Sequence, residues 1–382
     1  MWTFRVRSYD ERNDFGNPVL SRLPGLAARS ENTGKPRFLS PAAPGAREFV
    51  LRTVSDLVDR YDVDGLFLDY VRYDEETPDD WTSLTNYRLE RLGADAPWGE
   101  VDKRDYQLWR EEKVNRIVAD ISALFRAKPR TLALSAATFR GEAYTRKTKL
   151  QNWRHWADNA WLTYTTSMLY SDDPRELVGW ITQETDGGKR PHLFYPILGI
   201  HRMEDPGRAL LEQLRAVRQQ GQAGVFIFAL GHLPKSLLAD LARGPFRTPA
   251  VPPHRNPLGA ARQVLRQLGD QFFPRQATTG DWATVAAARV LGSEVASVVR
   301  SMPAGPPYFQ GPALVERLNG LHEVASRLER VNPGFQSEVT ARLRYAAALV
   351  RAHTQRTEAT RYVPPTVPHF DTATGNAKPD RP

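Results

Sequence analysis

Residues 63–73 read Val63-Asp64-Gly65-Leu66-Phe67-Leu68-Asp69-Tyr70-Val71-Arg72-Tyr73, an apolar run between two aspartates. Consecutive apolar positions are typical of a strand that is covered on both faces, as in a parallel sheet. A second run of this kind, Gly224-Val225-Phe226-Ile227-Phe228-Ala229, occurs later in the chain. Both runs are therefore predicted to lie in the middle of a parallel sheet in an α/β fold.

Asp64 and Asp69 lie at the two ends of the first of these strands. A strand of this length spans about 17 Å, so the two carboxylates cannot act as a pair on one substrate. Parallel α/β folds bind their ligands at the carboxyl ends of the strands. Asp69 is therefore the candidate functional residue, and Asp64 is expected to be a turn or cap residue.

Strands and helices are expected to alternate along the first 245 residues, which is typical of parallel βαβ units. The six predicted strands are Trp2–Arg7, Gly65–Tyr70, Thr131–Ala137, Trp161–Leu169, Leu193–Leu198 and Gly224–Leu230. The apolar spacing predicts helices over Ala46–Arg60, Asp105–Phe125, Gln151–Ala157, Pro174–Thr182, Gly207–Gln219 and Pro234–Leu241. Right-handed crossovers between these strands would build one continuous parallel sheet.

The chain divides into four regions by composition. Residues 1–245 carry the alternating pattern, and the proline-rich residues 246–257 are expected to be a linker. Residues 258–356 have the apolar spacing of a three- or four-helix bundle, over Leu258–Phe272, Asp281–Arg300, Pro312–Arg330 and Phe335–Thr354. Residues 357–382 are expected to be a disordered tail.

Six strands are too few for an eight-stranded barrel, and the first begins at residue 2. We expect about two further βα units upstream, because a central strand would otherwise present an unpaired edge. The alternative is an open sheet that the helical bundle caps.

Composition excludes several classes of protein. The 382 residues contain no cysteine, which excludes disulfides, thiol nucleophiles and thiolate metal sites. No apolar run reaches the about 18 residues of a membrane helix, and the first residues lack the apolar core of a signal peptide. Residues 251–382 hold 16 of the 52 basic and 10 of the 44 acidic residues, but the arginines are spaced singly. Nucleic-acid binding is therefore not expected, and steeply salt-dependent affinity would be needed to support it.

Polar side chains follow the other strand ends. Glu142 is a candidate acid/base partner in a loop, although a loop glutamate is more often simply solvated. Met168, Tyr170, His201, Arg202 and His232 are candidate substrate-binding residues at later strand ends. Aromatic residues at helix spacing could stack on a sugar but more often belong to a core, and this applies to Trp153, Trp156 and Tyr164.

Metal and phosphate sites have no support in the sequence. The eight histidines show no ligand spacing, so no metal is expected. Neither a phosphate-binding glycine loop nor a nucleophile elbow is present, and no cofactor is expected. Carboxylates with His, Tyr and Arg in an open cleft suit cleavage of a glycosidic bond, in which one carboxyl protonates the leaving oxygen and another stabilises or attacks the oxocarbenium-like centre.

The sequence resembles the glycosyl hydrolase-like 10 family, a bacterial family of barrel proteins related to lipoproteins, some of which act on peptidoglycan glycan strands. The resemblance extends over roughly residues 1–245. Its motifs are Leu39-Ser40-Pro41 to Arg47-Glu48-Phe49, residues 63–73, Trp153-Arg154-x-Trp156 leading into Ser167-Met168-Leu169-Tyr170, and Gly221-Gln222-Ala223-Gly224-Val225-Phe226-Ile227-Phe228.

The resemblance implies a (β/α)8 TIM-type barrel of which this chain supplies strands three to eight. It assigns the catalytic role to Asp69, with Tyr70, Arg72 and Tyr73 shaping the sugar subsite. Many relatives read Leu-Asp-Asp-Tyr where this chain has Leu68-Asp69-Tyr70, so no second carboxylate is available at position 70. Because many relatives are exported, an extracytoplasmic location is expected if an upstream segment carries a signal.

Two functions from different classes follow. The first is a glycoside hydrolase acting on a bacterial polysaccharide, such as peptidoglycan glycan strands, with Asp69 and Glu142 as its carboxylates. The second is a non-catalytic carbohydrate-binding or cell-envelope protein on a degenerate barrel. A carboxyl about 5 to 10 Å from Asp69 across an open groove would favour the hydrolase. The sequence leaves open the sugar, the stereochemical outcome, the oligomeric state and the role of the bundle.

Overall fold

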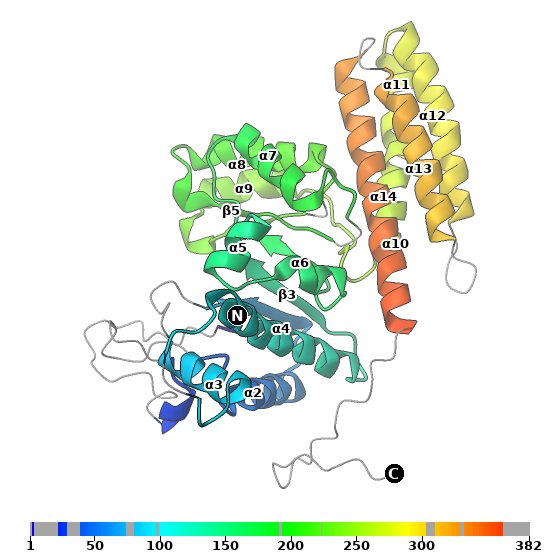
Figure 1. The fold of residues 1–382 in the computed structure, drawn as a ribbon. Coiled ribbons are helices and arrows are strands. Elements are labelled where there is room, and N and C mark those ends of the chain that lie inside the picture. Colours follow the sequence, from blue (N-terminus) through cyan, green and yellow to red (C-terminus); the bar gives the residue numbers. More distant parts are fainter. Residues whose placement is uncertain are drawn as a thin grey trace.

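The computed structural model describes residues 2–3, 22–28, 39–73, 80–96, 99–190, 193–222, 224–302, 310–328 and 332–361. These residues form an α/β part and a helical bundle beside it (Figure 1). The strands are β1 (Trp2–Thr3), β2 (Gly65–Asp69), β3 (Ala133–Thr138), β4 (Thr166–Ser167), β5 (Ile197–Gly199) and β6 (Phe226–Phe228). All recorded strand pairs are parallel, which confirms the predicted α/β class.

The strands lie in the order in which they occur in the chain. One sheet has the order β1-β2-β3-β4, and another pairs β5 with β6. Parallel bridges from Thr165 to Phe194 and from Met168 to Ile197 connect the two sheets. Within the described ranges, no pair joins β6 to β1, so the strands form an open series and the predicted barrel is not completed by them.

The sheet is strongly curled. The rings of Phe67 in β2 and Phe226 in β6 lie 5.4 Å apart between centroids. Four strand spacings of about 4.8 Å would separate β2 from β6 by about 19 Å in a flat sheet. Phe67 and Phe226 therefore mark the concave face of the sheet.

Helices cover the convex face. The helices of the α/β part are α2 (Ala46–Arg60), α3 (Trp81–Arg91), α4 (Lys103–Arg126), α5 (Glu142–Thr148), α6 (Trp153–Asp158), α7 (Pro174–Thr185), α8 (Pro206–Gln219) and α9 (Lys235–Arg243). Leu66 and Leu68 of β2 pack in one core with residues of α2 and α4, including Val54 and Ile117. This burial explains the apolar runs seen in the sequence.

Some elements differ from those predicted. α2 has the predicted bounds, whereas the predicted strand Trp161–Leu169 is reduced to Thr166–Ser167. The reason is that the hydroxyl of Thr163 accepts the N–H of Leu134 at 2.9 Å, replacing a backbone partner. Residues 4–7 of the first predicted strand lie outside the described residues. The helices α3 and α5 were not predicted, and Glu142 is the first residue of α5 rather than a loop residue.

The bundle consists of α10 (Pro257–Gln267), a π-helical turn (Leu268–Phe272), α11 (Phe273–Thr279), α12 (Trp282–Ser301), α13 (Gly311–Ser326) and α14 (Pro333–Arg361). The predicted break at Phe273-Pro274 is wrong. The π-helical turn lies immediately before Phe273, and the chain remains helical from α10 through Pro274 into α11. The long helices lie side by side, and α14 extends down beside the α/β part (Figure 1). Residues 357–361 of the predicted tail (357–382) are instead the last residues of α14, and residues 362–382 lie outside the described residues.

One helix of the bundle is long and apolar enough to cross a membrane. It is α12, and 28% of its most apolar window is buried. The sequence expectation of no such segment therefore has this one exception among the described residues. The core helix of a bundle meets the same criteria, and α12 packs Leu291, Val295 and Val298 into the bundle core.

Candidate functional site

Asp69 lies at the carboxyl end of β2, on the concave face of the sheet. Side chains alternate between the two faces of a strand, so Asp69 shares a face with Phe67, which contacts Phe226 across the curl. Asp69 is partly buried. The residue chosen from the sequence is therefore at the end of the sheet where parallel α/β folds bind ligands.

The surroundings of Asp69 favour its protonated form. Burial raises the pKa of the Asp69 carboxyl, while the backbone N–H of Tyr70 and the charge of Arg72 act in the opposite direction. The N–H of Tyr70 donates to Oδ1 of Asp69 at 2.9 Å. A carboxyl with a raised pKa is suited to donate a proton.

Tyr70 has a strained backbone directly after Asp69. Its φ is 55°, in the left-handed region that a bulky residue rarely adopts. Strain of this kind concentrates at functional sites. The guanidinium of Arg72 lies 4.7 Å from the centroid of the Tyr70 ring and 5.0 Å from that of Phe139, and it donates to the carbonyl of Tyr73 at 3.2 Å. Tyr70, Arg72 and Phe139 thus form a stacked group beside Asp69.

Aromatic side chains from three strand ends gather next to Asp69. The ring of Tyr170 lies 5.0 Å from His201 and 5.9 Å from Phe228, between centroids. His232 lies 5.8 Å from His201. Burial raises the pKa of Tyr170 to about 12, and the carboxylate of Asp69 adds to the rise.

The two histidines of the group are exposed at the strand ends. His201 lies in the short 3-10 helix Ile200–Arg202 after β5, and His232 in Leu230–His232 after β6. Desolvation lowers the pKa of His201, and the positive charge of Arg202 lowers it further. His201 is therefore neutral near pH 7 and can both donate and accept a hydrogen bond. Met168, predicted to bind substrate, is partly buried and bridges to Ile197.

Tyr73 lies in a different environment from the one predicted. It is buried, and its hydroxyl shares a 2.9 Å hydrogen bond with Ser83. Ser83 and Ser40 both donate to Oδ2 of Asp80 at 2.5 Å. Tyr73 therefore fixes the segment after β2 from inside the core and does not reach the surface. Trp153 and Trp156 are also fully buried and pack in the core, so they are not stacking platforms.

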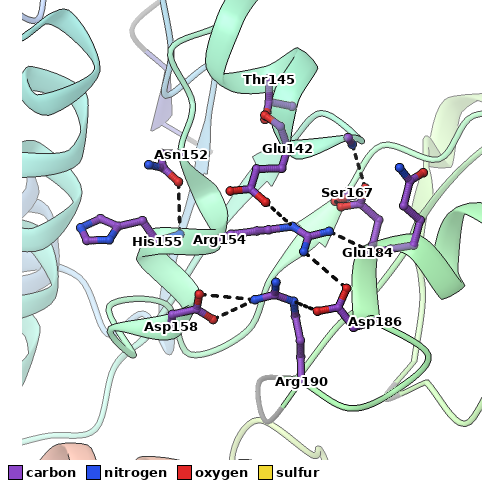
Figure 2. A network of polar contacts seen from close by, with 12 residues as sticks. Glu142, Thr145, Asn152, Arg154, His155, Asp158, Ser167, Glu184, Asp186 and Arg190 are labelled. Atoms are coloured by element: carbon purple, nitrogen blue, oxygen red, sulfur yellow. Dashed lines mark hydrogen bonds and ion pairs between the residues drawn. The ribbon is translucent and has the colours of Figure 1, made fainter. Parts of the chain in front are cut away.

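Glu142, the first residue of α5, belongs to a network of charged residues from α5, α6 and the end of α7 (Figure 2). Its Oε2 lies 3.4 Å from Nε of Arg154, and Nη1 of Arg154 lies 3.6 Å from Asp186. Arg190 joins the network by pairing with Asp186 at 2.9 Å and with Asp158 at 3.0 Å. Glu142 is thus brought together with Arg154.

Three residues of these clusters were not predicted. Phe139 lies against the guanidinium of Arg72, and Phe228 lies against the ring of Tyr170. The Phe228 side chain is 45% exposed. Phe228 could have been found from its place at the end of the apolar strand. Glu184 is fully buried and accepts the N–H of Gly141 at 2.7 Å. Its spacing from Leu177 and Ile181 places it on the buried face of α7, which is the signal that sequence reasoning missed.

No group of three or more His, Asp or Glu that could hold a metal ion is found within the described ranges. The site is therefore built from one carboxyl, aromatic rings, an arginine and two histidines.

The comparison with protein families supports the resemblance seen in the sequence. Residues 19–184 match the model of the family "Glycosyl hydrolase-like 10". Over these residues, the chain is similar to the glycosyl hydrolase-like 10 family. The match includes Asp69, Tyr170 and Glu142, whereas His201 and His232 lie beyond its end. This similarity suggests a carbohydrate-related function.

The chain is also similar to part of a much longer curated protein. It is 39% identical over 89 residues to an S-layer-related protein from Niallia circulans. The alignment covers 22% of this chain and 5% of that protein.

Proposed function

We propose that this protein is a glycoside hydrolase that acts on a bacterial polysaccharide, such as the glycan strands of peptidoglycan. The observation that carries the proposal is the Asp69 carboxyl on the concave face, with a raised pKa and with Tyr170 beside it. The sequential parallel strands and their curl support a barrel-type site, to which further strands would contribute.

Asp69 would act as the general acid. A protonated carboxyl donates to the glycosidic oxygen as the bond to the anomeric carbon breaks, which avoids an alkoxide leaving group. Because ionisation of Asp69 removes this proton, the rate should fall as the pH rises through its pKa.

The neighbouring side chains would bind the sugar. The rings of Tyr170 and Phe228 stack 23° from coplanar and present an apolar surface for one face of a pyranose. His201, His232 and Arg72 would bind hydroxyl groups, since each can donate a hydrogen bond. Tyr70 and the exposed Arg202 would complete the walls of this sugar-binding site.

Glu142 is the proposed second carboxylate. Its carboxylate pairs with Arg154, and a carboxylate is the group that stabilises an oxocarbenium-like centre or activates water. This role requires the Glu142 carboxylate to reach the sugar bound at Asp69.

The test is the release of reducing ends from purified peptidoglycan glycan strands. Wild type should release them, and Asp69→Asn should lose at least about a hundredfold of the rate, as expected when a general acid is removed. The matched control is Asp64→Asn, the same change at the other end of β2, where the side chain is exposed and pairs with Arg255. Equal rates for wild type and Asp69→Asn would remove Asp69 from the mechanism. Glu142→Gln tests the second carboxylate in the same assay.

A non-catalytic carbohydrate-binding or cell-envelope role is the second candidate. The observation that favours it is the engagement of Glu142 by Arg154 in a network of charged residues. The similarity to an S-layer-related protein is in keeping with a cell-envelope role. Binding of glycan strands that Asp69→Asn leaves intact, without release of reducing ends by any variant, would favour this function over hydrolysis.

A further inference from the structure

A cleft lies between the α/β part and the bundle, away from the carboxyl ends of the strands. Its walls are α8, the segment from Gly244 to Val251, α10 and the first turns of α14, and its volume is about 860 Å³. Ligand sites commonly have about 300–1,000 Å³ and occur at domain interfaces. The size and place of the cleft are those of a binding site.

The walls of the cleft carry an excess of positive charge. Four arginines and one glutamate line it, so the formal charge is four positive less one negative, or +3. The arginines are Arg215, Arg218, Arg247 and Arg342, and the glutamate is Glu338. Nε of Arg342 donates to Oε1 of Glu338 at 2.7 Å, which occupies the carboxylate. Arg215, Arg218 and Arg247 also line the cleft, so its positive charge exceeds its negative charge.

Arg218 lies among other charged residues that line the cleft. Desolvation lowers the pKa of Arg218, and the charges of Arg342 and Arg247 lower it further, while Glu338 acts in the opposite direction. Mutual repulsion of this kind is relieved when an anion binds between the guanidinium groups. A guanidinium also binds a carboxylate through two parallel hydrogen bonds, which gives direction as well as charge.

The remaining lining is rich in amide and apolar groups rather than aromatic ones. Five glutamines line the cleft, Gln219, Gln222, Gln263, Gln267 and Gln271. An amide both donates and accepts, as does a sugar hydroxyl. Among the lining residues of this cleft, Tyr345 is the one aromatic residue. Single-stranded nucleic acid is commonly bound by several stacked aromatic rings, and this lining does not provide them.

The wall that the linker forms is fixed by side chains. Arg218 donates to the carbonyl of Pro245. Nε2 of Gln263 donates to the carbonyl of Pro249 at 3.0 Å, and its Oε1 accepts the N–H of Val251 at 2.9 Å. The proline-rich segment is thus held against both α8 and α10, and the cleft is preformed.

From this geometry we propose that the cleft binds an acidic oligosaccharide, whose carboxylates pair with Arg218, Arg247 and Arg342 and whose hydroxyls bind the glutamines. The site is separate from Asp69 and does not depend on hydrolysis. It would hold a charged glycan chain against the seam between the two parts of the protein.

The test is calorimetric titration of the full chain with tetragalacturonate, with neutral cellotetraose as the uncharged counterpart. Wild type should bind tetragalacturonate and not cellotetraose, with affinity that falls as salt rises. Arg247→Gln combined with Arg342→Gln should weaken binding at least tenfold. Arg243→Gln is the control, because Arg243 is exposed at the end of α9, pairs with Asp240 and does not line the cleft. Asp69→Asn should leave this binding unchanged, which separates the cleft from the site of the proposed hydrolase.

Three results would overturn the proposal. The first is no binding of tetragalacturonate to wild type. The second is equal binding by wild type and the double arginine variant. The third is binding of tetraglutamate or oligothymidylate as tightly as tetragalacturonate, which would make the cleft a site for acidic peptides or nucleic acid instead.

Discussion

Gly199 at the end of β5 lies directly against the ring of Tyr170. A Cβ atom on Gly199 would come within 2.6 Å of Cδ1 of Tyr170 and within 3.0 Å of Cε1 of His201. Such distances are too short for carbon atoms that are not bonded to each other. The absence of a side chain at position 199 therefore sets the position of Tyr170 over β5, and with it the aromatic group beside Asp69.

Gly199→Ala should displace Tyr170. Because the added methyl group overpacks the strand end, the free energy of unfolding should fall by about 1–3 kcal/mol. Binding of glycan fragments, measured by calorimetry, should weaken more than the small loss of stability explains. Gly231→Ala is the matched control, since a Cβ there meets nothing within 4 Å. Equal binding by Gly199→Ala and Gly231→Ala would show that the Tyr170 ring does not contact the ligand.

Asp69→Asn should change how stability depends on pH. Burial raises the pKa of Asp69 in the folded protein. Its stabilising contribution is therefore fully present below the unfolded pKa of about 3.9 and is lost as the pH rises through the folded pKa. Asparagine does not ionise, so the Tm of Asp69→Asn minus that of wild type should increase between about pH 4 and about pH 7. A difference that is constant or decreases over this range, measured by calorimetry, would contradict the raised pKa.

The fold could be predicted where burial leaves a clear pattern in the sequence. α2 has the predicted bounds because Val50, Val54 and Val58 face the sheet at helical spacing. β2 and β6 could be predicted because both faces of these strands are covered, which gives consecutive apolar residues. Helices pack on one face, and Phe67 and Phe226 contact each other on the other face. β4 is shorter than its apolar run, because the hydrogen bond from Leu134 to the Thr163 side chain is a tertiary contact that leaves no local pattern.

The site could be predicted only in part, for a related reason. The position of a residue along a strand indicates which end of the sheet it occupies, and this was sufficient for Asp69 and His201. Whether a side chain near a strand end turns inward depends on partners far away in the sequence. Tyr73 follows β2 as Arg72 does, but Ser83 and Asp80 hold it in the core. Arg154 engages Glu142 from another helix in the same way.

Glu184 should matter for stability and not for glycan binding. It is buried, accepts the N–H of Gly141 at 2.7 Å and the hydroxyl of Ser167 at 3.3 Å, and joins α7 to the loop after β3. Glu184→Ala would leave the buried N–H of Gly141 without this acceptor and should cost about 1–3 kcal/mol of unfolding free energy, whereas the Ser167 hydroxyl would keep its contact with the Thr138 hydroxyl at 2.9 Å. Glu184→Gln should cost less, because its amide oxygen can still accept. Denaturant unfolding of both variants checks the order, and an Ala variant as stable as the Gln variant would contradict it.

Arg130 should be needed for the junction between α2 and β2. Its guanidinium donates to the carbonyl of Tyr61 at 2.9 Å and to that of Val63 at 2.8 Å, and it also bonds the carbonyl of Val58. These groups include carbonyls at the end of α2, which have no partner within the helix. Arg130→Lys keeps the charge but loses the planar fork, so it should lower the unfolding free energy by about 1–2 kcal/mol.

The matched control for Arg130 is Arg60→Lys at the same helix end. The Arg60 side chain is 71% exposed and pairs only with Asp56 among its recorded ion pairs, four positions earlier in α2. Exposed pairs of this kind contribute about 0.3–0.5 kcal/mol, so this variant should unfold close to wild type. The midpoints of urea unfolding, followed by tryptophan fluorescence, compare the two. If both variants unfold at the same midpoint, the fork of Arg130 does not hold α2 to β2, and packing of Val54 and Val58 against the sheet is sufficient for the junction.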